Sequence, residues 1–334
     1  MPETPLPPVP ADPGPPRWRS IPGYEVLGLL GRGGFGEILS ARRLADGRTA
    51  AVKLARVELG RAREQIHREA QALRSLGPPL VPELLEEGVL EDDAPYLALE
   101  RILAPSLAER LSAAGGPMDP DELRERALAL ANALSSLHAR GWTHGDLKPG
   151  HLLLGEGAMR LIDLGLAVRP GDPLARPVVP AGAFAGTAPY MAPEQVRGEP
   201  SDARSDVYAA GAILFEMATG RPPFEGAPGE IRQAHLALRP PRPSDLAAVP
   251  DPLEGVVLRC LAKEPASRFA DGAALHAALA AAFARPGAAR APSRRPGAPA
   301  VSRRLVGVLR FESGADLLSV KRASEAAGGR LAHV

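Results

Sequence analysis

The chain has 334 residues, which is long enough for one large domain or two ordinary ones with a sizeable core. Its formal net charge of +1 gives no electrostatic reason to expect a nucleic acid or a membrane surface as the main partner. The single cysteine, Cys260, excludes an internal disulfide, and no run of about 18 apolar residues predicts a membrane span. We therefore expect a cytoplasmic protein that binds no nucleic acid.

The first segment of the chain is rich in proline. We expect residues 1–20 to be extended and disordered, because proline does not fit regular hydrogen-bonded structure and the segment has few apolar side chains to bury. It also lacks the apolar centre of a signal peptide. A partner could dock on this segment, but a disordered tail is the plainer interpretation.

From residue 24 the sequence alternates between apolar and polar residues, a pattern that predicts β-strands. The expected strands cover residues 24–31, 35–43, 48–55, 83–92 and 95–102. Between the third and fourth strands, apolar residues at helical spacing predict a helix that ends at Gly77. The front of the chain is thus predicted to be β-rich with one helix.

Beyond residue 105 the pattern becomes helical. The expected helices cover residues 119–141, 204–219, 228–238, 252–263 and 271–284. A basic, proline-rich stretch at 285–304 then predicts a linker. Residues 305–334 have the pattern strand, helix, strand, which is too little for a core of its own, so we expect the start of a truncated domain there. This C-terminal segment is a second place where a partner could dock.

A glycine-rich turn joins the first two expected strands. Gly31, Gly33 and Gly36 have the spacing G-x-G-x-x-G, and Ile38 follows them. Glycines lack a Cβ, so the backbone can approach phosphate oxygens closely. The same residues would also suit an ordinary tight turn. Their place in a β-hairpin argues against a dinucleotide site, where a helix must follow the glycines.

Lysine is rare in this chain, which has four lysines among 40 basic residues. Lys53 lies between apolar neighbours in the third expected strand, which indicates that a compact point charge is needed there. Glu69, on the helix that follows, is the candidate ion-pair partner. Glu64 is its rival on the same helix.

The segment HGDLKPGHLLLG at 144–155 holds a second group of polar residues, Asp146, Lys148 and His151. Asp163 follows in RLIDLGLAV among apolar residues, where a buried acid requires a cation. A magnesium ion bound to phosphates is the cation that fits. Two acids, a lysine and a glycine hairpin together indicate phosphoryl transfer, in which positioning and charge neutralisation do most of the work.

Residues 24–284 resemble the eukaryotic-like bacterial Ser/Thr protein kinases. The matching motifs are GRGGFGEI, AVK with Lys53, REA with Glu69, HGDLKP, DLG at 163–165, GTAPYMAPE at 186–194, SDVYAAG at 205–211 and EPASRF. The resemblance implies an α+β, two-lobed protein-kinase-like fold. It has a small β-rich N-lobe at about 24–102 and a larger helical C-lobe at about 103–284. It also implies that Arg268 pairs with Glu194.

The resemblance implies a role for each motif residue. Asp146 would orient and deprotonate the attacking hydroxyl, and Lys148 would neutralise the γ-phosphate. Asp163 would hold magnesium, while Lys53, held by Glu69, would bind the α and β phosphates. The other residues expected around ATP are Gly31, Gly33, Gly36, Ile38, Ala51, Leu99, Glu100, Ile102 and Leu153.

The first departure from the family pattern concerns regulation. Gly145 stands where regulated kinases have arginine, and residues 163–186 contain no Ser, Thr or Tyr. The phosphate acceptor and the arginine that would bind the phosphate are therefore both absent. We expect the segment to be ordered without phosphorylation, or by a partner. The next hydroxyls, on Thr187 and Tyr190, are expected to be structural.

The second departure concerns the metal. His151 stands where the family has a metal-binding asparagine, and a histidine nitrogen suits Mn²⁺ better than Mg²⁺. Ligation by His151 would predict an activity that is weak or prefers manganese. Alternatively, His151 hydrogen-bonds the loop and leaves the metal to Asp163.

Three functions follow from these residues. The first is an active kinase that uses ATP with Mg²⁺ or Mn²⁺ to phosphorylate Ser and Thr of protein substrates, as in bacterial signalling. The second is a pseudokinase, a module that binds nucleotide or acts as a scaffold. The third is a small-molecule phosphotransferase, which HGD suggests but MAPE and SDVY oppose, because those parts build a platform for protein substrates.

Overall fold

The computed structural model describes residues 19–33, 36–55, 62–155, 158–169 and 187–284. All of them belong to the first of two units into which the chain divides, residues 1–293. The predictions for residues 1–18, for the linker at 285–304 and for the terminal segment at 305–334 concern residues outside these ranges. Most of the segment at 163–186, which is expected to be ordered without phosphorylation, also lies outside them.

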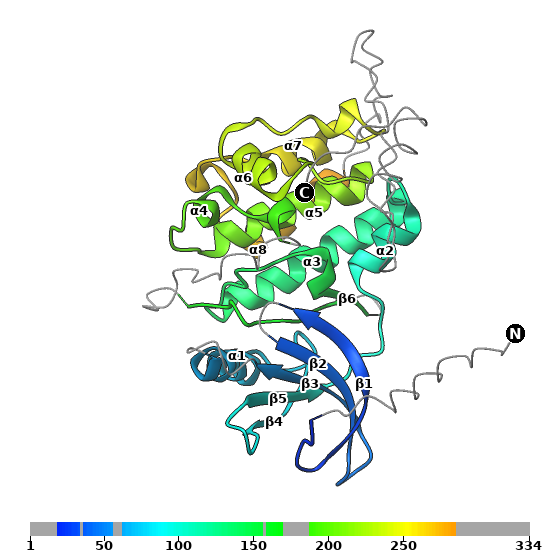
Figure 1. Cartoon of the computed structure of the whole chain (residues 1–334). Helices are drawn as coiled ribbons and strands as arrows, with labels where there is room; N and C mark the ends of the chain where they lie inside the picture. Colours follow the sequence, from blue (N-terminus) through cyan, green and yellow to red (C-terminus); the bar gives the residue numbers. More distant parts are fainter. Residues whose placement is uncertain (1–18, 34–35, 56–61, 156–157, 170–186, 285–334) are drawn as a thin grey trace, which may run out of the picture. The chain divides into compact units, whose positions relative to one another are not determined.

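The N-lobe is a five-stranded antiparallel sheet with one helix (Figure 1). The strands are β1 (Tyr24–Gly33), β2 (Gly36–Arg43), β3 (Thr49–Ala55), β4 (Leu84–Val89) and β5 (Pro95–Glu100), in the spatial order β1-β2-β3-β5-β4. The helix, α1 (Ala62–Leu76), contributes its apolar residues to the same core cluster as Leu97 of β5. The β-rich front with one helix is confirmed.

Strand β3 shows how the alternation positions a functional residue. Ala50, Val52 and Leu54 are buried in the core of the sheet. Because successive side chains of a strand point to opposite faces, Ala51 and Lys53 share the other face. The antiparallel register places Lys53 opposite Ile38 of β2 and Ala51 opposite Leu99 of β5.

The C-lobe is helical, as the resemblance implies. Its α-helices are α2 (Leu107–Ala114), α3 (Pro120–Ala139), α4 (Pro193–Val196), α5 (Ala203–Thr219), α6 (Pro228–Ala237), α7 (Asp251–Cys260) and α8 (Gly272–Ala284). Helix α5 is buried along most of its length, which agrees with its apolar residues on every side. Within the described part of the chain, every helix is too short or too polar to cross a membrane.

Helix α2 was missed by the sequence pattern. It is only two turns long, so it offers too few apolar positions for a helical period to stand out. Its start is nevertheless encoded by a capping box. Ser106 accepts a hydrogen bond from the main-chain N–H of Glu109, and the Glu109 carboxylate accepts one from the Ser106 N–H. Gly115, with φ 62°, ends the helix.

Short elements lie between α3 and α5. After the family motifs that they match, we call residues 144–151 the catalytic loop and residues 187–194 the peptide-binding segment. A single 3₁₀ turn, η1 (Pro149–His151), leads directly into a small hairpin of β6 (Leu152–Leu154) and β7 (Met159–Leu161). A second 3₁₀ turn, η2 (Ala188–Tyr190), precedes α4. The core residues of this region, among them Leu152 and Leu161, belong to the large cluster that also contains the apolar face of α1. This shared core fixes the loop residues against both lobes.

Candidate active site

A cavity of about 670 Å³ opens on the face of the sheet that carries Ala51 and Lys53. Its lining includes these predicted residues: Ile38, Ala51, Lys53, Glu69, Leu99, Glu100, Ile102, Leu153 and Asp163. The residues that sequence reasoning left out are Leu30, Pro82, Arg101, Leu103, Ala104, Pro105, Glu109 and Ile162. Most of the lining is apolar. One group of charges consists of Lys53, Glu69 and Asp163, and the other charged lining residues are Glu100, Arg101 and Glu109. This arrangement suits a flat apolar ring with an anionic tail.

The three glycines lie at the hairpin between β1 and β2, and they are not among the residues that line the cavity. Gly31 pairs with Ile38 and Gly33 pairs with Gly36. At Gly36 a Cβ would collide with the main-chain carbonyl of Leu54, so close backbone packing requires glycine there. The contact of these glycines with phosphate stays a prediction.

Lys53 forms the centre of the charged group. Its Nζ donates to Oε2 of Glu69 at 2.7 Å and to Oδ1 of Asp163 at 2.6 Å. Glu69 is buried whereas Glu64 is exposed, so Glu69 is the partner of Lys53. Burial opposes the charge on Lys53, but the two carboxylates outweigh it and raise the pKa of the ammonium group above its usual value. One cation thus joins β3, α1 and the segment after β7.

Asp163 is held as an anion in this setting. Burial alone would raise the pKa of its carboxyl, but the positive charge of Lys53 reverses that effect and holds the pKa below its usual range. The backbone of Asp163 has φ 60°, a left-handed conformation that is uncommon for a residue with a side chain. This strained residue holds its carboxylate with Oδ1 in contact with Lys53 and Oδ2 facing His151.

The catalytic-loop backbone is suspended from helix α5. The buried carboxylate of Asp206 accepts hydrogen bonds from the main-chain N–H of His144 at 2.7 Å and of Gly145 at 3.0 Å. The next residue, Asp146, accepts a hydrogen bond from Nζ of Lys148 at 3.0 Å. The same Nζ donates to Oγ1 of Thr187 at 3.1 Å. Lys148 therefore lies between the acid of the loop and the start of the peptide-binding segment.

His151 uses its two ring nitrogens differently. Nδ1 lies 2.9 Å from the main-chain carbonyl of Asp146, and because a carbonyl only accepts, Nδ1 carries the hydrogen. Burial lowers the pKa of His151 to about 4, so the ring is neutral at pH 7 and Nε2 presents a lone pair. That lone pair faces Oδ2 of Asp163 at 3.3 Å. Two electron-rich atoms thus face each other.

A cation between Nε2 and Oδ2 would turn this repulsive contact into a favourable one. Ligand atoms of Asp146, His151 and Asp163 all lie within 4.8 Å of one another, so the residues present fit a divalent metal. The two interpretations of His151 are compatible, because the hydrogen bond to the loop uses Nδ1 and a metal would use Nε2.

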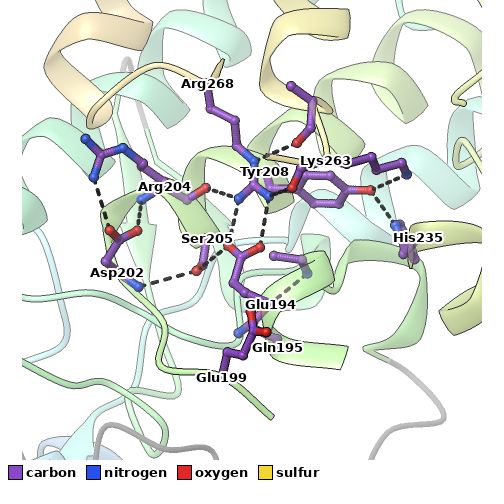
Figure 2. Close-up of polar contacts among 12 residues, drawn as sticks. Glu194, Gln195, Glu199, Asp202, Arg204, Ser205, Tyr208, His235, Lys263 and Arg268 are labelled. Atoms are coloured by element: carbon purple, nitrogen blue, oxygen red, sulfur yellow. Dashed lines mark hydrogen bonds and ion pairs between the residues drawn. The ribbon is translucent and has the colours of Figure 1, made fainter. Parts of the chain in front are cut away.

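The peptide-binding segment is anchored by a buried ion pair (Figure 2). Arg268 donates through Nη1 and Nη2 to the two carboxylate oxygens of Glu194, at 2.7 and 2.9 Å. Ser205 of α5 donates to the same carboxylate at 2.7 Å. The hydroxyls expected to be structural are also engaged: Thr187 accepts from Lys148, and Tyr190 donates to Glu216 at 2.7 Å.

Two sets of contacts escaped the sequence reasoning. Gln195 donates through Nε2 to the carbonyl of Gly145 at 2.7 Å, which links α4 to the catalytic loop. Elsewhere, the guanidinium of Arg169 lies 4.6 Å from the ring centroid of Trp142, and both residues donate to Oγ of Ser75. Neither set follows a motif or a period, because each depends on how distant segments meet.

Comparison with known proteins matches most of the chain to one family. Residues 24–281 match the protein kinase domain family. A probable serine/threonine-protein kinase of Corynebacterium efficiens is 36% identical over 269 residues, which cover 77% of this chain and 40% of the relative. The serine/threonine-protein kinase PknB of Mycobacterium leprae is 34% identical over 265 residues, 77% of this chain and 42% of the relative. The chain thus spans about two fifths of the length of these relatives.

Proposed function

The chain belongs to the protein kinase domain family, and on this premise we propose that it is an ATP-dependent serine/threonine kinase that phosphorylates protein hydroxyls. The observation that carries the proposal is Lys53 in contact with both Glu69 and Asp163. A lysine shared by two carboxylates from separate elements is ready to hold phosphates next to a metal ligand. We place this activity in bacterial signalling in the cytoplasm.

The residues divide the work of phosphoryl transfer among them. The apolar lining around Ala51 and Leu153 would hold the adenine, and Lys53 would bind the α and β phosphates. Asp146 would orient the substrate hydroxyl and accept its proton. Lys148, already between Asp146 and Thr187, would neutralise the transferred phosphoryl group.

Asp163 and His151 would hold the divalent metal. Such an ion supplies neutralisation of the negative charge on the phosphate oxygens. Asp163 offers a hard carboxylate oxygen, whereas Nε2 of His151 is a nitrogen ligand, which manganese accepts more readily than magnesium does. We therefore propose that activity with Mn²⁺ exceeds activity with Mg²⁺.

The pseudokinase alternative rests on the same histidine. If Nε2 of His151 holds the metal away from productive geometry, the cavity would bind nucleotide without turnover. A small-molecule phosphotransferase is disfavoured, because the buried pair of Glu194 and Arg268 builds the segment that seats a protein chain.

Transfer of labelled γ-phosphate to a generic basic protein tests the proposal. We expect the wild-type chain to label the protein on Ser and Thr, and Asp163→Ala to lose at least about 100-fold of the rate because the metal ligand is gone. Asp92→Ala is the matched control. It removes an exposed acid that belongs neither to the cavity lining nor to the candidate metal ligands, so the rate should be retained. Equal labelling by the wild type and Asp163→Ala would overturn the proposal.

The same assay with His151→Asn isolates the metal preference. Asparagine replaces the nitrogen ligand by an amide oxygen, so the ratio of the Mn²⁺ rate to the Mg²⁺ rate should fall several-fold. An unchanged ratio would show that His151 acts only through its hydrogen bond to the loop.

A further inference from the structure

The peptide group that follows Gly145 is held next to the residue that would act as the base. Its carbonyl accepts a hydrogen bond from Nε2 of Gln195 at 2.7 Å. On the other side of the same residue, the Gly145 N–H donates to Asp206 at 3.0 Å. Both backbone groups of this glycine are therefore fixed by side chains from elsewhere in the C-lobe. Asp146 begins at the peptide that Gln195 holds.

The orientation of the Gln195 amide is determined by its partners. The Gly145 carbonyl can only accept, so the NH₂ group of Gln195 faces it. The main-chain N–H of Ala192 can only donate, and it does so to Oε1 of Gln195 at 3.0 Å. One side chain therefore joins the start of α4 to the catalytic loop, and no flipped amide could make both bonds.

Helix α4 is itself firmly attached to the rest of the C-lobe. Gln195 directly follows Glu194, whose carboxylate is buried against Arg268 and Ser205 (Figure 2). A displacement of the peptide-binding segment would therefore move Gln195 only together with this ion pair. The amide of Gln195 transmits the position of the anchored segment to the loop.

A glycine at position 145 needs contacts that hold its backbone in one conformation. It loses more conformational freedom on ordering than any other residue, and Gly145 is held at φ 77°. Arginine, which stands here in regulated kinases, can be fixed by a phosphate on the segment. In this chain residues 163–186 offer no hydroxyl for that purpose. A neutral amide contact needs no modification to form.

We propose that Gln195 is a positioning residue. It holds the Gly145 peptide, and with it Asp146, in a fixed position relative to the peptide-binding segment, where the protein substrate would bind. The inference rests on the proposed kinase function and adds how the catalytic loop is set without phosphorylation. Gln195 acts through Asp146 and contacts neither the nucleotide cavity nor the metal ligands.

Gln195→Glu is the sharpest variant for a test. It keeps the shape and the acceptor for Ala192, but it removes the donor to Gly145 and sets a carboxylate oxygen against a carbonyl. Gln233→Glu makes the same chemical change on the exposed side of α6 and is the matched control. A third variant, Gln195→Lys, retains a donor and should recover part of the loss.

Three readouts on the full chain separate positioning from folding. For Gln195→Glu we expect kcat for protein phosphorylation to fall about 10-fold or more, which is about 1.4 kcal/mol. ATP affinity should stay within about twofold, since the nucleotide cavity does not include Gln195. ATP hydrolysis in the absence of a protein substrate should fall less than protein phosphorylation. A water molecule does not need to be aligned with the peptide-binding segment.

Hydrogen–deuterium exchange tests the contact without relying on activity. In Gln195→Glu the amides of residues 144–148 should exchange several-fold faster than in the wild type or Gln233→Glu. Unchanged exchange would overturn the inference, as would equal loss of protein phosphorylation, ATP hydrolysis and ATP affinity, which indicates general damage. A wild-type chain that transfers no phosphate, but whose loop exchange responds to Gln195→Glu, would contradict the proposed function and leave the contact established.

Discussion

Gly145 shows why this catalytic loop cannot be converted to the regulated form by one substitution. Its φ of 77° lies in the left-handed region, and a Cβ would lie 2.6 Å from the main-chain oxygen of Leu166. A contact this short requires the backbone to move. The segment around Leu166 therefore approaches the loop more closely than a loop with a side chain at this position would allow.

Replacement of Gly145 by alanine tests this packing. We expect Gly145→Ala to lower the free energy of unfolding by about 1–3 kcal/mol, because the methyl group adds both backbone strain and a clash. Gly255→Ala on α7, where a Cβ has open space, should instead be neutral or stabilise by up to about 1 kcal/mol. Urea unfolding of both variants gives the comparison. A Gly145→Ala variant as stable as the wild type would show that the loop and Leu166 adjust freely.

At the scale of elements, a buried polar network joins α4, α5, α6 and the turn after α7 (Figure 2). Arg268 is almost fully buried, and besides Glu194 it donates to the carbonyls of Ala262, Lys263 and Arg204. Ala262 and Lys263 lie in the turn after α7, whereas Arg204 lies in the first turn of α5. The guanidinium therefore serves as a structural centre for this side of the C-lobe.

Removal of that centre should be costly. We expect Arg268→Leu to lower the free energy of unfolding by about 3–5 kcal/mol, because the Glu194 carboxylate would stay buried without a cation. The matched control is Arg204→Ala, which breaks a pair with Asp202 whose side chains are 39% and 51% exposed, and it should cost less than about 1 kcal/mol. Equal losses in chemical denaturation would contradict the distinction.

The same network contains a row of three polar side chains, Lys263, Tyr208 and His235. Lys263 Nζ donates to the Tyr208 hydroxyl at 3.3 Å, and that hydroxyl lies 2.8 Å from Nδ1 of His235 (Figure 2). Burial lowers the pKa of His235 to about 4, and the nearby Lys263 charge acts in the same direction.

This shifted histidine makes stability depend on pH. The unfolded chain binds a proton at His235 below about pH 6.5, but the folded chain does so only near pH 4, so stability is lost as pH falls between these values. From pH 7 to pH 5 the loss due to His235 should be about 2 kcal/mol. In His235→Gln the difference in unfolding free energy between the two pH values should shrink by that amount. No change in His235→Gln would contradict a buried neutral ring.

At the scale of the whole unit, several polar contacts connect the lobes, and two of them lie at the cavity. Lys53 of β3 contacts Asp163, which follows β7, and Arg160 of β7 donates to both carboxylate oxygens of Glu100 at the end of β5. The second of these contacts holds Glu100, the first residue of the segment 100–105 that lines the cavity. Nucleotide and metal would thus bind between parts that side chains already hold in position.

The alternation of apolar residues predicted all five strands of the N-lobe sheet, and helical spacing predicted α1 and α3 together with α5 to α8. These patterns report burial on one face, which is why they also identified the setting of Lys53. Helix α2 was too short to show a period. The contacts of Gln195 and Arg169 could not be predicted, because a half-buried amide or an exposed guanidinium has no preferred partner until the chain has folded.

The most direct measurement of the central claim is turnover of a protein substrate by the wild type and by Asp146→Asn, with ATP affinity determined for both. Asparagine preserves shape but cannot accept the proton of the hydroxyl. We predict that ATP affinity stays within about twofold while turnover falls at least about 100-fold. Equal turnover in the two proteins, or ATP binding by the wild type without any turnover above background, would contradict the account of this chain as an active kinase.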